Sequence, residues 1–497
     1  MENTIKILPG TPDDDNRDYL PESIKGSDIV VNENGNNSQP YPKNLQEFHG
    51  IMGNDEEDEW YEYVPENYDP SKKTPLVLAM HGGLMTGWGQ AVYTSWTMMA
   101  DRDCFIAVFP NAHKGRQWSL LPLALELEVQ EQMPPELHQN LYSNEENPDF
   151  KFILALIEYL KGKYNIDEGR IFMQGMSNGN MFTSQFARYH GDILAAASGA
   201  GGGTPNPNHL QENGKIKNDA GPVGMWTSIP ETNGCPPWCE YDDLTIYKYT
   251  RVYWNEVNGC VTEPEISITG EDAYAFYKGG AVDTVFYEKK NRDHGQALDE
   301  AAIVWDYYFS GLRRKEDGTI ADEGSRIPRK GDAFNISVAD GCKTAWLNNK
   351  KVEMKTAAVK WQKLKYHGLN GGQIVKGEYI CAPVSFIAEA FGLEYRCEED
   401  GAVAYIYLED GRELQFARGS IATVMEDEVR CMYCEALHRD GELLISIEWF
   451  ARFIMKACAS KCEDVVYVTD HYAELGVDMA DVLRNLLHNE KETIILK

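Results

Sequence analysis

Short apolar runs and helical repeats of apolar residues alternate through the first part of the chain. Asn147 followed by Pro148 is typical of a helix start, and the apolar residues that follow recur at helical spacing over 153–160. A second amphipathic helix is expected at 298–312. Strands that alternate with helices predict a mostly parallel sheet covered on both faces. The expected strands of this sheet are 76–80, 104–109, 171–174, 193–198, 223–228 and 282–287.

The same pattern divides the 497 residues into four segments. The segment 1–59 is rich in Asn, Asp, Glu, Pro and Gly, and we expect it to be extended or partly disordered. The α/β pattern occupies 60–316, and a polar, turn-rich linker is expected at 317–328. In 329–497 a strand–short helix–strand pattern occurs twice, about 64 residues apart. This repeat predicts a smaller α+β domain in which two copies share one core.

The pentapeptide Gly175-Met-Ser-Asn-Gly179 lies between a predicted strand and a predicted helix. In α/β-hydrolases a sharp strand–Gly-x-Ser-x-Gly–helix turn exposes a serine nucleophile, and small residues flank it because larger ones would clash. A chain with 43 glycines can contain such a pentapeptide by chance, so the strand and the helix around it carry the argument. They predict Ser177 as a nucleophile, the alternative being an ordinary strand–helix turn.

A base and an acid should follow the nucleophile in this chain order. His294 comes just after the last predicted strand and before the closing helix, where the base is expected. The alternative for His294 is a surface-loop histidine. Glu231 directly follows the strand 223–228 and is the best-placed acid, with Asp242 and Asp243 as rivals. An ordinary surface carboxylate stays open for all three.

The oxyanion of acyl transfer needs backbone donors beside the nucleophile. One should be the N–H of Asn178, and the other should come from Gly83 or Leu84 in the loop after the first strand. His81, in the same loop, is expected to be a structural hydrogen-bonding residue. The insertion 120–142 is expected to shape substrate choice. Two tryptophans could stack on a substrate ring, although tryptophan is as often part of a core; they are Trp118 and, in Cys235-Pro-Pro-Trp-Cys239, Trp238.

Several motifs occur together in a specific order over roughly 60–312. In this combination the chain resembles the polyhydroxybutyrate depolymerase and feruloyl esterase family of α/β-hydrolases. The resemblance implies an esterase fold and a Ser-His-acid triad, with Glu231 at the acid position although the usual His-Gly-x-x-Asp of the family is replaced there. The motifs are Thr74-Pro-Leu-Val77, His81-Gly-Gly83, Asp149-Phe-Lys-Phe-Ile153, Gly175 to Gly179, Tyr253-Trp254, Asn258-Gly-Cys260 and Asp293-His-Gly295.

The C-terminal part resembles a stalk module named after the copper amine oxidase N-terminal domain. The residues that carry this resemblance are the stretches 345–352 and 383–392 and the repeat near 441–468. The module implies a spacer or a docking surface. Its name does not imply that this chain binds copper, and the sequence contains no clustered histidine site for that metal. Cys431, Cys434, Cys458 and Cys462 could bind zinc, but buried thiols or one disulfide fit their positions better. No metal or cofactor is expected.

The composition of the chain narrows the classes of binding partner and the cellular compartments that are expected. A formal net charge of −31 disfavours nucleic acid and anionic membrane surfaces. No run of about 18 apolar residues exists, so no membrane span is expected. The first residues lack a signal-peptide pattern, so the chain as written is expected in the cytoplasm, or at the cell surface or outside if a signal has been removed. Eleven cysteines imply no dense disulfide framework and slightly favour a reducing compartment.

These observations lead to a serine carboxylic-ester hydrolase. The resemblance implies feruloyl or acetyl esters of plant polysaccharide, or short polyesters, as substrates. It also implies that the C-terminal module could dock on a cell wall or polysaccharide. The alternatives are a serine peptidase and a cell-surface binding protein built on an inactive hydrolase.

Overall fold

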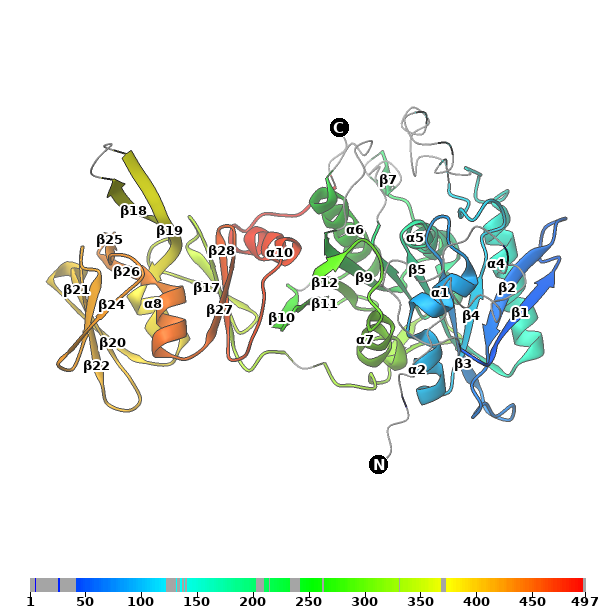
Figure 1. The fold of residues 1–497 in the computed structure, drawn as a ribbon, viewed down its shortest axis with the longest axis horizontal. Helices are drawn as coiled ribbons and strands as arrows, with labels where there is room; N and C mark the ends of the chain where they lie inside the picture. Colours follow the sequence, from blue (N-terminus) through cyan, green and yellow to red (C-terminus); the bar gives the residue numbers. More distant parts are fainter. Residues whose placement is uncertain are drawn as a thin grey trace. The chain divides into compact units, whose positions relative to one another are not determined.

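The structure, a computed structural model, describes residues 42–121, 141–202, 210–213, 215–232, 242–261, 263–329, 331–367 and 372–494, together with residues 5, 26, 131, 135 and 138. Its backbone forms two compact units (Figure 1). Unit 1 comprises residues up to 262, then 276–329 and 493–497, and unit 2 comprises 263–275 and 330–492.

The largest sheet has ten strands in the order β1-β2-β4-β3-β5-β6-β9-β12-β11-β10, and the strands from β1 through β12 in this order belong to unit 1. Pairing is parallel from β4 through β12 and antiparallel among β1, β2 and β4, which confirms the predicted mostly parallel sheet. The strands are β1 (Leu45–Gly50), β2 (Asp58–Tyr63), β3 (Thr74–Met80), β4 (Ile106–Pro110), β5 (Ile166–Met176), β6 (Ala196–Ala200), β9 (Gly224–Thr232), β10 (Glu265–Thr269), β11 (Asp272–Tyr277) and β12 (Thr284–Asp293). The helices are α1 (Gly87–Tyr93), α2 (Trp96–Asp103), α4 (Pro148–Lys163), α5 (Asn178–His190), α6 (Asp243–Asn258) and α7 (Glu300–Tyr307). Two short ribbons pair β7 (Gln211–Glu212) with β8 (Lys215–Ile216) and β13 (Leu312–Arg314) with β14 (Ile320–Asp322).

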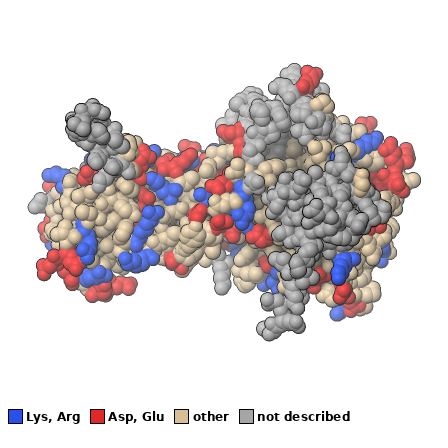
Figure 2. All heavy atoms as spheres, in the orientation of Figure 1, with Lys and Arg blue, Asp and Glu red and all other residues tan. Residues whose placement is uncertain are grey.

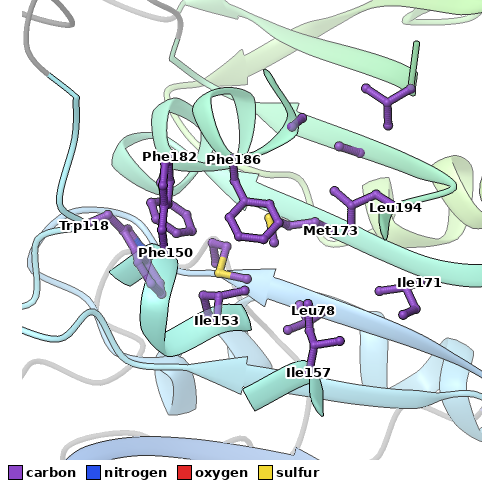
Figure 3. Packing of buried hydrophobic residues seen from close by; sticks show 14 of the residues in the cluster. Leu78, Trp118, Phe150, Ile153, Ile157, Ile171, Met173, Phe182, Phe186 and Leu194 are labelled. Carbon is purple, nitrogen blue, oxygen red and sulfur yellow. The ribbon is translucent and has the colours of Figure 1, made fainter. Parts of the chain in front are cut away.

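Alternate residues of β5 serve two different cores, as the two-residue period of a strand requires. Ile171 and Met173 belong to the buried cluster that includes α4 and α5, and Figure 3 shows the ring of Phe186 close to Met173. Phe172, between them, stacks on Phe309 with ring centroids 4.8 Å apart. The central sheet is therefore covered on both faces, as an α/β-hydrolase fold requires.

Two boundaries differ from the sequence prediction. The closing helix ends at Tyr307 instead of 312, because Tyr308 leaves helical geometry (φ −141°) and Phe309 turns into the aromatic core. The segment predicted as a linker, 317–328, contains β14, which pairs with β13. Arg329 then bridges Asp283 (2.8 Å) and Asp322 (2.6 Å), so unit 1 continues to Arg329. Within 1–59, β1 pairs with β2 over its whole length.

Unit 2 is β-rich, and the predicted repeat is visible in it. The first strands of the two copies, β19 and β26, pair with each other, and each is followed by a short helix. Phe386 after β19 and Phe450 after β26 lie in one buried cluster. The elements are β15 (Asn335–Ala339), β16 (Thr344–Leu347), β17 (Lys350–Glu353), β18 (Val359–His367), β19 (Gly372–Pro383), α8 (Val384–Ala390), β20 (Glu394–Glu398), β21 (Val403–Tyr407), β22 (Glu413–Ala417), β23 (Ala422–Met425), β24 (Glu428–Cys431), β25 (Leu437–Arg439), β26 (Glu442–Ser446), α9 (Ile447–Trp449), β27 (Cys458–Cys462), β28 (Val465–Thr469) and α10 (Val477–Leu487).

Charged side chains of both signs are present on the described surface. On the face drawn in Figure 2, Lys and Arg are interspersed with Asp and Glu over much of the described surface. The described residues contain no helix long and apolar enough to cross a membrane.

Candidate active site

Ser177 occupies the sharp turn between β5 and α5. Its φ of 54° and ψ of −118° are unusual for a residue with a side chain, which is the strain expected of a nucleophile elbow. Its N–H donates to the carbonyl of Ala200 at 2.8 Å. A Cβ at Gly175 would collide with the carbonyl of Gly179, and one at Gly179 would collide with the carbonyl of His81. The close packing around the turn therefore leaves no room for a side chain at either glycine of the pentapeptide.

The fold brings His294 to Ser177 across 117 positions of sequence. The Nε2 atom of the imidazole lies 2.9 Å from the Ser177 Oγ. His294 follows the last residue of β12 and is exposed. The distance is within hydrogen-bond range for a base and the hydroxyl that it deprotonates.

Three glycines pack around this pair, of which Gly201 and Gly202 were not singled out in the sequence. Gly202, with a φ of 138°, would place a Cβ 3.1 Å from the Ser177 carbonyl oxygen. Gly201, with a φ of 51°, would place one 3.0 Å from the backbone nitrogen of Gly295, and a Cβ on Gly295 would in turn collide with the hydroxyl of Tyr93. The glycine-rich run after β6 thus lets backbone of three loops approach closely. The feature of the sequence that could have identified these residues was the glycine-rich composition of the run after β6.

The two candidate oxyanion donors in the loop after β3, Leu84 and Gly83, differ in whether their N–H already has an acceptor. Leu84 adopts a left-handed φ of 63°, and its N–H donates to the carbonyl of Arg116 at 2.8 Å. This hydrogen bond already occupies the Leu84 N–H, which disfavours Leu84 among the two alternatives. The N–H of Gly83 donates to no acceptor among the described residues, so Gly83 is the better candidate. Asn178 is the first residue of α5, next to Ser177, and its side-chain carbonyl accepts the N–H of Trp118 at 2.7 Å.

Trp118 is part of the core and not of a substrate surface. Its side chain is 0 % exposed, and its ring stacks on Phe182 with centroids 4.6 Å apart (Figure 3). Its indole N–H donates to the carbonyl of His81 at 2.9 Å. The prediction that Trp118 stacks on a substrate ring is therefore corrected, because no face of the ring reaches solvent. Trp238 lies outside the described residues.

His81 has the structural role that was expected. Its Nε2 accepts the N–H of Ala112 at 2.9 Å, and its Nδ1 lies 2.7 Å from the carbonyl of Gly82. Burial lowers the pKa of this imidazole to about 4, so it is neutral near pH 7. A neutral imidazole that accepts at Nε2 and donates at Nδ1 ties the loops after β3 and β4 together.

Glu231 lies against the segment that leads to His294. Its carboxylate accepts the backbone N–H of Asn291 at 2.8 Å and is 3.3 Å from the Lys290 ammonium. The Asn291 hydrogen bond, followed by the charge of Lys290, holds the pKa of Glu231 below its usual value. Within the described chain these two groups are its polar partners, and the imidazole is not one of them. Of the rivals, Asp242 is already occupied as the N-cap of α6, where its side chain accepts the N–H of Thr245.

A cavity of about 830 Å³ borders the residues on either side of His294. Its lining combines apolar side chains of α2 and α7 with polar groups of β9 and of the segment around His294. These include Met98, Met99, Ala302, Glu231, Asn291 and Gly295. The cavity is far larger than an acetyl group, so it has room for a bulky part of a substrate. Most of the insertion 120–142 lies outside the described residues.

Metal-binding geometry is absent from the described part of the chain: no group of three or more His, Cys, Asp or Glu side chains could hold an ion there. Cys434 is buried next to Cys381, with the two Sγ atoms 3.5 Å apart, whereas Cys431 is exposed. The four-cysteine zinc alternative therefore has no support from the described geometry.

No protein-family model matches the chain. Parts of it are similar to curated esterases. It is 26% identical over 157 residues to feruloyl esterase B of Thermothelomyces thermophilus, which covers 31% of this chain and 47% of that protein. It is 26% identical over 141 residues to a probable acetylxylan esterase A of Aspergillus fumigatus (28% and 33% covered). It is 27% identical over 122 residues to a bifunctional acetylxylan esterase/xylanase of Neocallimastix patriciarum (24% and 14% covered). The matches thus span less than half of each of these relatives.

Two of the solved structures that match part of the chain are esterases. An acetyl xylan esterase from Aspergillus awamori matches with a TM-score of 0.40 and 16% identity, covering 54% of this chain and 98% of that one. A ferulic acid esterase from Anaeromyces mucronatus matches with a TM-score of 0.32 and 14% identity, covering 52% and 87%.

Proposed function

We propose that this chain is a serine carboxylic-ester hydrolase that works through an acyl-enzyme. The observation that carries the proposal is the 2.9 Å contact between His294 Nε2 and the Oγ of Ser177, at an elbow with left-handed backbone. A serine becomes nucleophilic when a neighbouring base takes its proton, and the elbow keeps the attacking oxygen accessible. The partial similarity to curated feruloyl and acetylxylan esterases supports the same reaction.

In the proposed reaction Ser177 Oγ attacks the ester carbonyl while His294 takes its proton. The N–H groups of Asn178 and Gly83 stabilise the oxyanion that forms. His294 then gives the proton to the departing alcohol, which leaves an acyl group on Ser177. Water, deprotonated by His294, attacks this acyl group; the bond to Ser177 Oγ then breaks, His294 returns the proton to that oxygen, and the carboxylic acid is released.

Glu231 is proposed as the acidic member of the triad. The chain order nucleophile, acid, base supports it, and so does its hydrogen bond to Asn291, three residues before His294. Its ion pair with Lys290 is partly exposed, and such pairs are weak, typically about 0–1 kcal/mol. Asp243 stays a rival by position, whereas the capping contact of Asp242 counts against that residue.

The proposed substrates are acetyl or feruloyl esters of plant polysaccharide, with short polyesters as a further possibility. The names of the curated relatives support the first two classes, and the 830 Å³ cavity beside His294 supports a bulky group on one side of the ester. For residues 330–492 we propose a spacer or a docking surface for polysaccharide, on the resemblance to a stalk module. Co-sedimentation of the full chain with insoluble xylan tests this role, and full recovery of the chain in the supernatant would contradict docking.

The reaction is tested with the full chain and a fluorophosphonate probe, which labels activated serines. We expect labelling of the wild type and none of Ser177→Ala, together with hydrolysis of 4-nitrophenyl acetate, methyl ferulate or acetylated xylan. Failure of a folded wild type to be labelled would favour the binding protein on an inactive hydrolase. Faster turnover of a matched aryl amide than of the aryl ester would favour a peptidase.

A further inference from the structure

A cluster of three buried glutamine side chains lies on the α1 and α7 side of the central sheet. Gln174 is in β5, three residues before Ser177, and Gln296 follows His294 by two residues. Gln90 is in α1, the helix that follows the loop carrying Gly83. The exposed fractions of Gln90, Gln174 and Gln296 are 0, 0 and 2 %. The cluster thus contains one side chain from the strand that leads to Ser177, one from the segment of His294 and one from the helix after the Gly83 loop.

The hydrogen bonds of this cluster converge on Gln90. Its Nε2 donates to the side-chain carbonyl of Gln174 and to that of Gln296, each at 3.3 Å. An amide Nε2 carries two hydrogens, so both bonds can form at once. The Gln174 carbonyl also accepts the indole N–H of Trp96 at 3.2 Å, and its own amide donates to the Gly175 carbonyl at 2.8 Å. The printed bonds leave two buried amide atoms of the cluster, Gln90 Oε1 and Gln296 Nε2, without a hydrogen-bond partner in the described chain.

The helix that carries Gln90 is itself held in place. Thr86 caps its N-terminus by accepting the N–H of Gly89 at 3.0 Å, and the N–H of Gly87 donates to Asn111 at 2.6 Å. At its other end, the hydroxyl of Tyr93 lies where a Cβ on Gly295 would collide with it. Gln90 therefore has a fixed position in the fold. A movement of the His294 segment would break the buried hydrogen bond between Gln90 and Gln296.

We propose that Gln90 is a positioning residue that holds the Ser177 strand and the His294 segment in register through the amides of Gln174 and Gln296. The proposal rests on the esterase function proposed above. A buried amide that loses its partner is costly, so this arrangement favours one placement of the imidazole relative to Ser177 Oγ. Small errors in such placement reduce the rate of the chemical step more than the binding of substrate.

The test is a double-mutant cycle on the full chain with 4-nitrophenyl acetate as the probe. Gln90→Met removes both donors at similar length, and Gln296→Met removes one acceptor. We expect each to lower kcat roughly 10- to 100-fold with KM changed less than about 3-fold. The double variant should be no slower than Gln90→Met alone, because both changes break the same hydrogen bond.

Gln185→Met is the matched control. Gln185 is also 0 % exposed and accepts a backbone N–H, from Leu121 at 2.8 Å, but it is in α5 and its printed hydrogen bond is not to the cluster. It should lose stability without a comparable loss of kcat. Thermal unfolding is recorded for every variant, and Gln296→Met keeps the test available if Gln90→Met does not fold.

Three results would overturn the proposal: wild-type kcat in Gln90→Met, losses that multiply in the double variant, or an equal loss of kcat in Gln185→Met. These differ from failure of the esterase function itself, in which the wild type neither hydrolyses the ester nor reacts with a fluorophosphonate.

Discussion

The Oγ of Ser177 and the Nε2 of His294 lie 2.9 Å apart, and each is placed by a backbone that only small neighbours permit. If this pair performs acyl transfer, Ser177→Ala and His294→Ala should each lower kcat by about 10⁶-fold, because nucleophile and base work as a unit. The double variant should resemble either single one. Stopped-flow or long-incubation assays on one fast aryl ester measure the loss, with circular dichroism to confirm folding. A residual rate above about one thousandth of the wild type in Ser177→Ala would contradict its role as nucleophile.

The acid is tested by changing single carboxylates to amides. If Glu231 orients the imidazole, Glu231→Gln should lower kcat by on the order of 10⁴-fold, less than loss of Ser177. Asp242→Asn serves as the matched control, because an amide can still cap α6 through its carbonyl oxygen. Near-wild-type activity of Glu231→Gln would limit that residue to anchoring Asn291, and a large loss in Asp243→Asn would transfer the acid role to Asp243.

The parts of the proposed site that depend on local pattern could be predicted from the sequence. The pentapeptide around Ser177 and the position of His294 after a strand follow from short-range signals, and the parallel sheet follows from alternation. Trp118 was misplaced because an indole in a loop looks the same in sequence whether it faces solvent or the core. The choice between Gly83 and Leu84 stayed open in the sequence because the hydrogen bond from the Leu84 N–H to Arg116 is a contact that no local pattern encodes. Gln90, Gln174 and Gln296 are far apart in sequence and become one cluster only through the fold.

The buried position of Trp118 predicts a stability effect without a substrate effect. Trp118→Phe keeps an aromatic ring against Phe182 but loses the indole bond to His81, which should cost on the order of 1 kcal/mol of unfolding free energy. Trp118→Ala should cost about 3–5 kcal/mol. Urea unfolding measures both, and KM for methyl ferulate should be unchanged in Trp118→Phe. A raised KM at unchanged stability would instead return Trp118 to the substrate site.

Glu300 predicts a pH dependence of stability. Burial raises the pKa of this carboxyl from 4.5 to about 8 in the folded chain, against smaller opposing effects of Ser228 and Lys289. Between pH 4.5 and about 8 the folded state therefore holds a proton that the unfolded state has released, and stability falls as pH rises through this window. Glu300→Gln should abolish this contribution, with a gain at pH 7 of at most about 3 kcal/mol. Urea unfolding at pH 5 and pH 8 measures it; equal wild-type and variant slopes with pH would contradict a neutral buried Glu300.

Gly202 offers a test of how the elbow is supported from outside the pentapeptide. Its φ of 138° is one that side-chain-bearing residues rarely adopt, and a Cβ there would lie 3.1 Å from the Ser177 carbonyl oxygen and 3.2 Å from the Ser177 Cα. Gly202→Ala should therefore push on the backbone of the nucleophile, and we expect kcat to fall by roughly 10- to 100-fold, as small displacements of reacting groups do.

The matched control for Gly202→Ala is Gly221→Ala. Gly221 also has a positive φ, of 78°, but a Cβ there would meet no atom within 4 Å. Gly221→Ala should thus carry the cost of backbone strain, typically about 1 kcal/mol, while kcat on an aryl acetate is unchanged. Comparing kcat at matched folded fractions separates strain from contact with Ser177. Equal activity of the two variants would show that the elbow tolerates movement of the loop after β6, and that its geometry is set by Gly175 and Gly179 alone.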